Sequence, residues 1–176
     1  MRLKICLAAL AATVAFASPA FAAPVSASAT AEAHGLVLQP LTLTKAADLD
    51  FGTILASAVL GDVTIDADTG NRTTSGGVTP VASNPGQRAL FAGAGTAGQQ
   101  VNLTLTPPVS NLLVSTTNPA DTIFVSSMVF DNGNLLIRTI GAGGTFQVGV
   151  GATFDIAASQ PNGFYKADFD VTADYQ

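Results

Sequence analysis

The sequence predicts an all-β domain, folded as an antiparallel sandwich or barrel, behind a short N-terminal leader. Two observations predict this class. After the first 22 residues, no stretch keeps apolar residues at helical spacing for three turns between capping residues. Instead, short runs of β-branched and aromatic residues are separated by Gly, Pro, Asn and Asp. Many short strands at nearly regular spacing are typical of β-sandwiches and β-barrels.

The leader has the three parts of a secretory signal peptide. Arg2 and Lys4 give it a positive start, the apolar run Ile5–Phe16 follows, and small residues precede a predicted cut after Ala22, with a cut after Ala23 as the alternative. An uncleaved anchor or a buried helix is the other interpretation, but the run is too short to span a bilayer, which takes roughly 20 residues. We therefore expect export through the inner membrane to the periplasm and the cell surface, with no membrane span.

Charge and cysteine content narrow the classes of partner. The full chain has a formal net charge of −5; without Arg2 and Lys4, five basic residues remain against twelve acidic ones, which gives −7. An acidic surface argues against binding nucleic acid or anionic lipid through bulk charge. The one cysteine, Cys6, lies in the leader, so the exported chain is expected to fold without a disulfide.

The predicted strands are marked by alternation and by turns. Val101, Leu103 and Leu105 alternate with polar residues, as in a half-buried antiparallel strand. Residues 131–134 predict a hairpin turn because Asn and Gly accept positive φ, and the polar stretch 66–86 predicts a long loop or a loose hairpin. In chain order, the predicted strands are Leu36–Lys45, Asp50–Leu55, Asp62–Ile65, Gln87–Ala92, Gln100–Thr106, Ile123–Phe130, Leu135–Thr139, Gly144–Gly149, Thr153–Ile156 and Phe164–Tyr175.

The last strand alternates strictly over its whole length. Its apolar face is expected to be buried, and its other face carries three Asp, which discourage indiscriminate edge pairing. A long alternating strand at a chain end can pair with the edge of another sheet. The predicted apolar face, followed by the terminal residue, consists of Gly163, Tyr165, Ala167, Phe169, Val171, Ala173, Tyr175 and Gln176.

This strand resembles the C-terminal motif of chaperone–usher pilus subunits. Tyr175 is the penultimate residue and Gly163 is fourteenth from the end, as in that motif. The resemblance implies a fibre built by donor-strand exchange, with a periplasmic chaperone that grips the carboxylate of Gln176 and an outer-membrane usher. It implies that 163–175 forms one wall of a receiving groove in a domain that lacks its own final strand. The alternative is an ordinary final edge strand of a sandwich.

The segment after the leader has a strand pattern of its own. Its apolar face would be the donor strand that the resemblance implies, and a disordered linker is the alternative. The predicted organisation is a signal peptide (1–22), an N-terminal extension (23–35) and a β-sandwich domain (36–176). The candidate donor residues are Val25, Ala27, Ala29, Ala31 and Ala33.

Three short stretches resemble a second family, bacterial secreted proteins described only as domain of unknown function 4402. They are the stretch from Leu41 through Asp48-Leu49-Asp50-Phe51-Gly52-Thr53-Ile54, the stretch Phe146-Gln147-Val148-Gly149, and the stretch Gln160-Pro161-Asn162-Gly163-Phe164-Tyr165. This resemblance implies an immunoglobulin-like sandwich of the pilin type, and does not by itself establish a function.

The chain offers no constellation that predicts catalysis. His34 is the only histidine, and it lies in the extension, so no catalytic, cofactor or metal residue is predicted. Asp62, Asp66 and Asp68 leave a calcium loop as an alternative to a solvated turn. A structural fibre subunit, built from copies of itself or other subunits, is the favoured function; a free-standing secreted binding or adhesion domain is the alternative. Shaft and tip positions in the fibre stay open.

Overall fold

The computed structural model describes residues 25–176, so the predicted signal peptide lies outside the described residues. The chain divides into two units between Leu36 and Val37. In the first unit, the described residues form neither helix nor strand, and their side chains are exposed. Within 25–176, no helix is long and apolar enough to cross a membrane.

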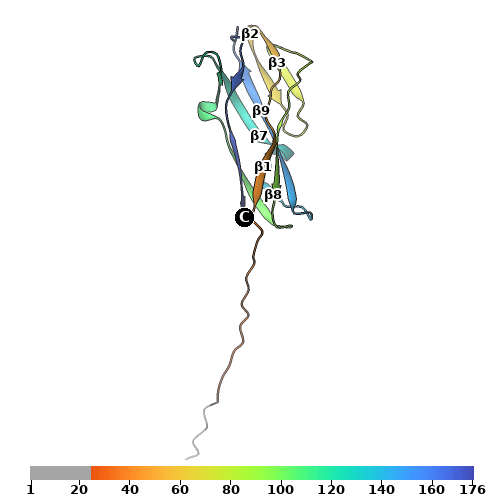
Figure 1. Ribbon diagram of the computed structural model, residues 1–176, viewed down its shortest axis with the longest axis vertical. Helices are drawn as coiled ribbons and strands as arrows, with labels where there is room; N and C mark the ends of the chain where they lie inside the picture. The colour runs from red at the N-terminus through yellow and green to blue at the C-terminus, as the bar shows by residue number, and fades with distance from the viewer. Residues whose placement is uncertain (1–24) are drawn as a thin grey trace, which may run out of the picture. The chain divides into compact units, whose positions relative to one another are not determined.

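The second unit is an antiparallel β-sandwich, which confirms the predicted all-β class. The larger sheet has the order β1-β4-β9-β7-β6-β10, with β2 also paired to β9 and to β3 (Figure 1). The smaller sheet has the order β11-β5-β8. The strands are β1 (Thr42–Ala47), β2 (Ile54–Ile65), β3 (Arg72–Pro80), β4 (Ala89–Ala94), β5 (Gln100–Thr106), β6 (Leu112–Ser115), β7 (Thr122–Phe130), β8 (Ile137–Thr139), β9 (Thr145–Ile156), β10 (Tyr165–Lys166) and β11 (Asp170–Tyr175); short helical turns form η1 (Val109–Asn111) and α1 (Asp131–Asn134).

Strand β9 is the centre of the larger sheet. One edge pairs with β4 along its first half and with β2 along its second half, while β7 pairs with the other edge. The sequence predicted two strands here, Gly144–Gly149 and Thr153–Ile156, separated at 150–152. They form one strand: a Cβ at Gly151 would lie 2.3 Å from the carbonyl oxygen of Ile65, so glycine lets the end of β2 approach closely.

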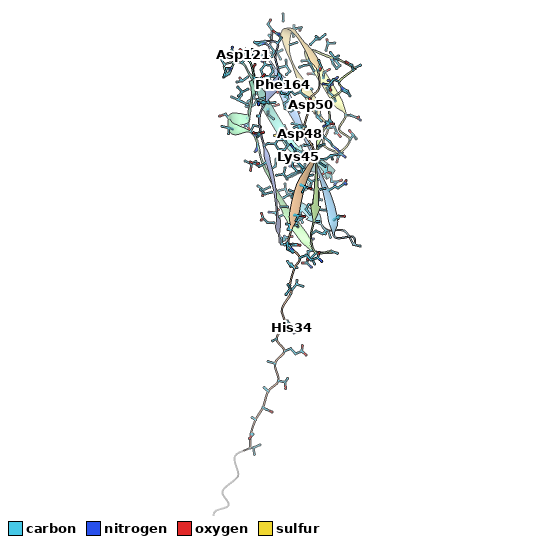
Figure 2. The ribbon with its side chains drawn as sticks, in the orientation of Figure 1. His34, Lys45, Asp48, Asp50, Asp121 and Phe164 are labelled. Carbon is cyan, nitrogen blue, oxygen red and sulfur yellow. The ribbon has the colours of Figure 1, made fainter. Side chains whose placement is uncertain are left out.

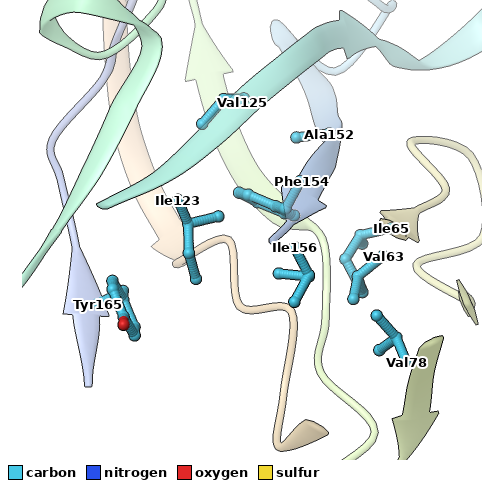
Figure 3. Close-up of a cluster of buried hydrophobic side chains, with 9 residues drawn as sticks. All are labelled: Val63, Ile65, Val78, Ile123, Val125, Ala152, Phe154, Ile156 and Tyr165. Carbon is cyan, nitrogen blue, oxygen red and sulfur yellow. The ribbon is translucent and has the colours of Figure 1, made fainter. Parts of the chain in front are cut away.

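The smaller sheet covers only part of the larger one, and two apolar clusters result. The cluster that contains β5 residues and packs against β11 is called the covered half. The other cluster, shown in Figure 3, is called the open half. The covered half is built on Ala89, Val101, Leu103, Phe130, Ile140, Phe146, Val148 and Val150. The open half is built on Val63, Ile65, Val78, Ile123, Val125, Ala152, Phe154, Ile156 and Tyr165.

Other strand boundaries differ from the prediction for related reasons. The stretch 66–86 contains β3, which pairs with β2 although its residues are mostly Thr, Ser and Gly. The predicted strand 62–65 and the last two residues of the predicted strand 50–55 lie in one strand, β2, with a register shift between Ala56 and Gly61. Strand β6 was not predicted, and the first predicted strand starts only at Thr42. In these cases, backbone pairing with a distant strand determined where each strand begins and ends, and local composition did not.

Candidate functional site

An apolar groove opens beside the open half of the sandwich. It lies between 48–56, which leads from β1 into β2, and 160–169, which contains β10. Asp48, Asp50 and Phe164 mark this region (Figure 2). The groove has a volume of about 860 Å³ and is lined mainly by apolar atoms.

The floor of the groove is made of side chains from the larger sheet. Phe154 of β9 lies among Ile123 and Val125 of β7, and all three are at least 96 % buried. The ring of Phe51 tilts against that of Phe154, with centroids 5.1 Å apart. Leu49 and Phe51 are only half-buried although they pack on this cluster. The floor is thus core-like in composition and almost fully buried, and the groove opens beside the half-buried Leu49 and Phe51.

Hydrogen bonds fix the first wall, residues 48–56, to neighbouring segments of the chain. Asp50 and Gln87 exchange backbone N–H···O=C bonds of 2.9 and 2.8 Å. The Arg72 guanidinium donates to four carbonyl oxygens, those of Phe51, Thr53, Val81 and Asn84, at 2.9–3.1 Å. Within the described residues, Leu49 makes no backbone–backbone hydrogen bond. The wall is therefore fixed on its outer side and has free backbone groups at Leu49.

The second wall is the C-terminal segment, and it also carries unpaired backbone. Tyr165 and Lys166 of β10 pair with β6, and the Tyr165 hydroxyl accepts from the Gln160 amide at 2.9 Å and donates to the Pro161 carbonyl at 2.6 Å. Among the described residues, no backbone–backbone hydrogen bond involves 167–169. Phe164 stands at the rim with 69 % of its surface exposed.

Tyr175 joins the two sheets beyond the groove. Its hydroxyl accepts a hydrogen bond from the Thr96 N–H at 2.7 Å and donates to the Gln39 carbonyl at 2.8 Å. A Cβ at Gly95 would lie 2.4 Å from this hydroxyl, so glycine makes room for it. The backbone N–H of Gln176 donates to the Gln100 carbonyl at 3.0 Å. The chain end is therefore tied to the covered half.

The predicted C-terminal strand is two strands. The structure replaces one strand over 164–175 with β10 in the larger sheet and β11 in the smaller one, because the chain crosses between sheets at 167–169. The predicted apolar face divides accordingly. Gly163, Tyr165, Ala167 and Phe169 line the groove, whereas Val171, Ala173 and Tyr175 pack on the covered half.

Sequence reasoning missed several groove residues. Leu49 and Phe51 lie in the stretch 48–52 that carries the second family resemblance, which was a usable signal. Phe154 was placed in a strand but given no role. Arg72 had no signal, because its four acceptors are backbone carbonyls from segments distant in sequence. The candidate donor residues 25–33 are exposed in the first unit, and their role stays a prediction.

The Asp residues of the possible calcium loop have other partners. The Asp66 carboxylate accepts from the Thr69 hydroxyl and from the backbone N–H groups of Thr69 and Asp68, and these bonds lower the pKa of Asp66, the hydroxyl most. Asp62 accepts from the Ser75 hydroxyl at 2.6 Å. Within the described part of the chain, no three His, Cys, Asp or Glu side chains form a group that could hold a metal ion.

Taken together, the fold and groove define an antiparallel β-sandwich protein with an apolar groove along its larger sheet, bordered by the segment that crosses to the smaller sheet. The chain belongs to the family described as domain of unknown function (DUF4402), whose model matches residues 41–175 and so includes both groove walls. The comparisons with curated proteins and with solved structures found no match.

Proposed function

We propose that the protein is a structural subunit of a cell-surface fibre, assembled by donor-strand exchange. One observation carries this proposal. An apolar groove lies open between two backbone segments, at Leu49 and at 167–169, that make no backbone–backbone hydrogen bonds. A β-strand from another chain supplies both missing components, because its backbone pairs with the walls while alternate side chains enter the groove.

The N-terminal extension is the proposed donor. Val25, Ala27, Ala29, Ala31 and Ala33 share one face of a strand, and that face would point into the groove of a neighbouring subunit. The contact is head-to-tail and does not close on itself, so repeated contacts produce a fibre. A periplasmic chaperone would cover the groove before assembly, and an outer-membrane usher would exchange it for the donor. This proposal places the protein in the periplasm and then on the cell surface.

The experiment changes the extension in cells that make the protein with its natural partners. Deletion of residues 25–33 should leave folded subunits and abolish the ladder of multimers in an unboiled SDS gel. A matched pair tests the face: Ala29→Asp should abolish the ladder because it places a charge in the groove, and Ser28→Asp should leave it. Fibres that persist after the deletion would overturn the donor-strand proposal.

A second candidate is a free-standing secreted binding or adhesion domain. The observation that favours it is the groove itself, because a mostly apolar volume of about 860 Å³ falls in the range of small-molecule sites. The same unboiled gel separates the two candidates. A single sharp monomer band from the unaltered protein supports the solitary domain, and a ladder supports the fibre subunit.

A further inference from the structure

Two asparagine–glycine pairs are exposed in the fold, and they differ in conformation. Asn132–Gly133 lies in the turn α1, and Asn162–Gly163 lies in the loop before β10. Asparagine is chemically labile, most of all before glycine, because the next backbone nitrogen attacks the side-chain amide and glycine has no Cβ to hinder it. Both asparagines are exposed, so access of water does not distinguish them.

The turn α1 holds Asn132 in a conformation that prevents this attack. Ring closure needs the asparagine Cβ and the next backbone nitrogen on the same side of the Cα–C bond. At φ 54° and ψ 43°, the Asn132 Cβ and the Gly133 nitrogen lie on opposite sides. The Asn132 N–H donates to the Asp68 carboxylate at 2.5 Å, and the Phe130 N–H donates to the Asn134 side chain at 3.0 Å. The turn must therefore open before Asn132 can react.

The loop at Asn162 has no such restraint. Among the described residues, no hydrogen bond involves Asn162 or Gly163, and Asn162 is outside the left-handed region. Phe164, which follows the pair, is exposed at the groove rim (Figure 2). Rotation about the Asn162 Cα–C bond thus breaks no hydrogen bond of the pair, and it can bring the Cβ and the Gly163 nitrogen to the same side.

We propose that Asn162–Gly163 is a site of spontaneous deamidation and that the turn α1 protects Asn132–Gly133. The Gly163 nitrogen forms a bond to the Asn162 Cγ, the bond from Cγ to Nδ2 breaks, and ammonia leaves with the proton of the Gly163 N–H. Water then opens the succinimide ring. Attack of water at Cγ gives aspartate in the original backbone, and attack at the backbone carbonyl carbon gives isoaspartate. Nothing is oxidised or reduced.

Isoaspartate would alter the second groove wall. The pair lies between two fixed points: the Pro161 carbonyl accepts from the Tyr165 hydroxyl at 2.6 Å, and the Phe164 carbonyl accepts from the Thr116 N–H at 2.8 Å. Isoaspartate inserts an additional carbon into the main chain between these points, so the two hydrogen bonds cannot both keep their geometry. Aspartate adds the same negative charge without that carbon. The change in the wall is therefore specific to isoaspartate.

The experiment incubates the purified exported protein at mildly alkaline pH and follows deamidation by peptide mass mapping. In the folded protein, residue 162 should gain the mass of an amide-to-acid conversion at least about tenfold faster than residue 132, because Asn132 reacts only when its turn opens. In urea-unfolded protein, the two rates should converge, because the turn is lost. Asn162→Gln is the matched control: it keeps an amide, and its longer side chain should stop the reaction at this position.

Amide hydrogen exchange tests the effect on the wall. Exchange at Thr116 and Tyr165 should be faster in the isoaspartate form, separated by chromatography, and unchanged in Asn162→Asp, which carries the charge alone. Equal deamidation rates at residues 162 and 132 in the folded protein would overturn the protection by α1. No mass gain at residue 162, under conditions in which the unfolded protein deamidates, would overturn the site. Equal exchange in the isoaspartate form and in Asn162→Asp would overturn the effect on the wall. These outcomes are independent of fibre assembly, which the gel tests.

Discussion

The covered and open halves of the sandwich are built from the same strand but differ in what lies over them. Phe146, Val148 and Val150 of β9 are buried beneath the smaller sheet. Phe154 continues the same face and is nearly as buried, yet Leu49 beside it is only half-buried. Both halves have core composition; the covered half packs against strands of the smaller sheet, and the open half borders the groove.

The difference arises where the C-terminal segment changes sheets. Strand β11 pairs with β5 and closes the covered half, while β10 joins the edge of the larger sheet and leaves the open half without a lid. An apolar groove beside backbone groups that make no backbone–backbone hydrogen bonds can accept a further strand. The comparison shows that the groove borders only the open half, which is where the proposed donor strand would add.

The largest expected effect comes from removing one aromatic side chain in each half. Phe130→Ala, in the covered half, should lower the free energy of unfolding by about 3–5 kcal/mol, because it leaves a closed cavity. Phe154→Ala should cost less, about 2–3 kcal/mol, because its ring borders the groove. Urea unfolding measures both variants. Equal costs would show that the open half is as well packed as the covered half and would break the comparison.

The next effect concerns the first groove wall. Arg72→Ala should lower the free energy of unfolding by about 2–3 kcal/mol, because four carbonyl groups lose a charged donor. Amide exchange at Asp50 and Thr53 should accelerate as the wall loosens. Arg72→Lys is the control: it keeps the charge, cannot reach all four carbonyls and should restore only part of the stability. Slow exchange in Arg72→Ala would show that the guanidinium does not hold the wall.

Two tyrosines allow the same change in both halves. Tyr175→Phe removes the bonds to Thr96 and Gln39 at the covered half and should cost about 1–2 kcal/mol in urea unfolding. Tyr165→Phe removes the bonds to Gln160 and Pro161 and should cost a similar amount. Only Tyr165→Phe should speed amide exchange at the groove rim. Faster exchange at the rim in Tyr175→Phe would mean that the two halves are coupled.

The smallest expected effect is a pH dependence at the turn after β2. The pKa of Asp66 is lowered in the folded state from its ordinary 3.8, so the unfolded chain binds the proton more readily. The stabilisation is therefore present above the ordinary pKa and is lost as the pH falls through the folded value. Because Asp66 is exposed, the change should be small. Unfolding measured at a series of pH values should show a weaker acid dependence in Asp66→Asn, and an unchanged dependence would contradict this assignment.

Particular elements show how far sequence reasoning reached. Strand β5 was predicted with its observed bounds because Val101, Leu103 and Leu105 alternate with polar residues, and alternation is a local property. The inward face of the last strand was also predicted correctly at Tyr165, Val171 and Tyr175. The break at 167–169 was not, because the alternation continues through it. A period-2 alternation looks the same whether the chain stays in one sheet or crosses to another, so it does not mark the crossing.

The sequence by itself determined the all-β class, a turn at 131–134 and the side chains that face inward, because these follow from residue type and spacing. The predicted hairpin at that turn was wrong, because β7 and β8 on either side of it lie in different sheets and do not pair. Only the tertiary structure decided that β9 is continuous, that Arg72 holds a wall and that the smaller sheet stops short of Phe154. Those features depend on which distant backbone segments pair. The open groove, the feature with the most functional meaning, belongs to this second kind.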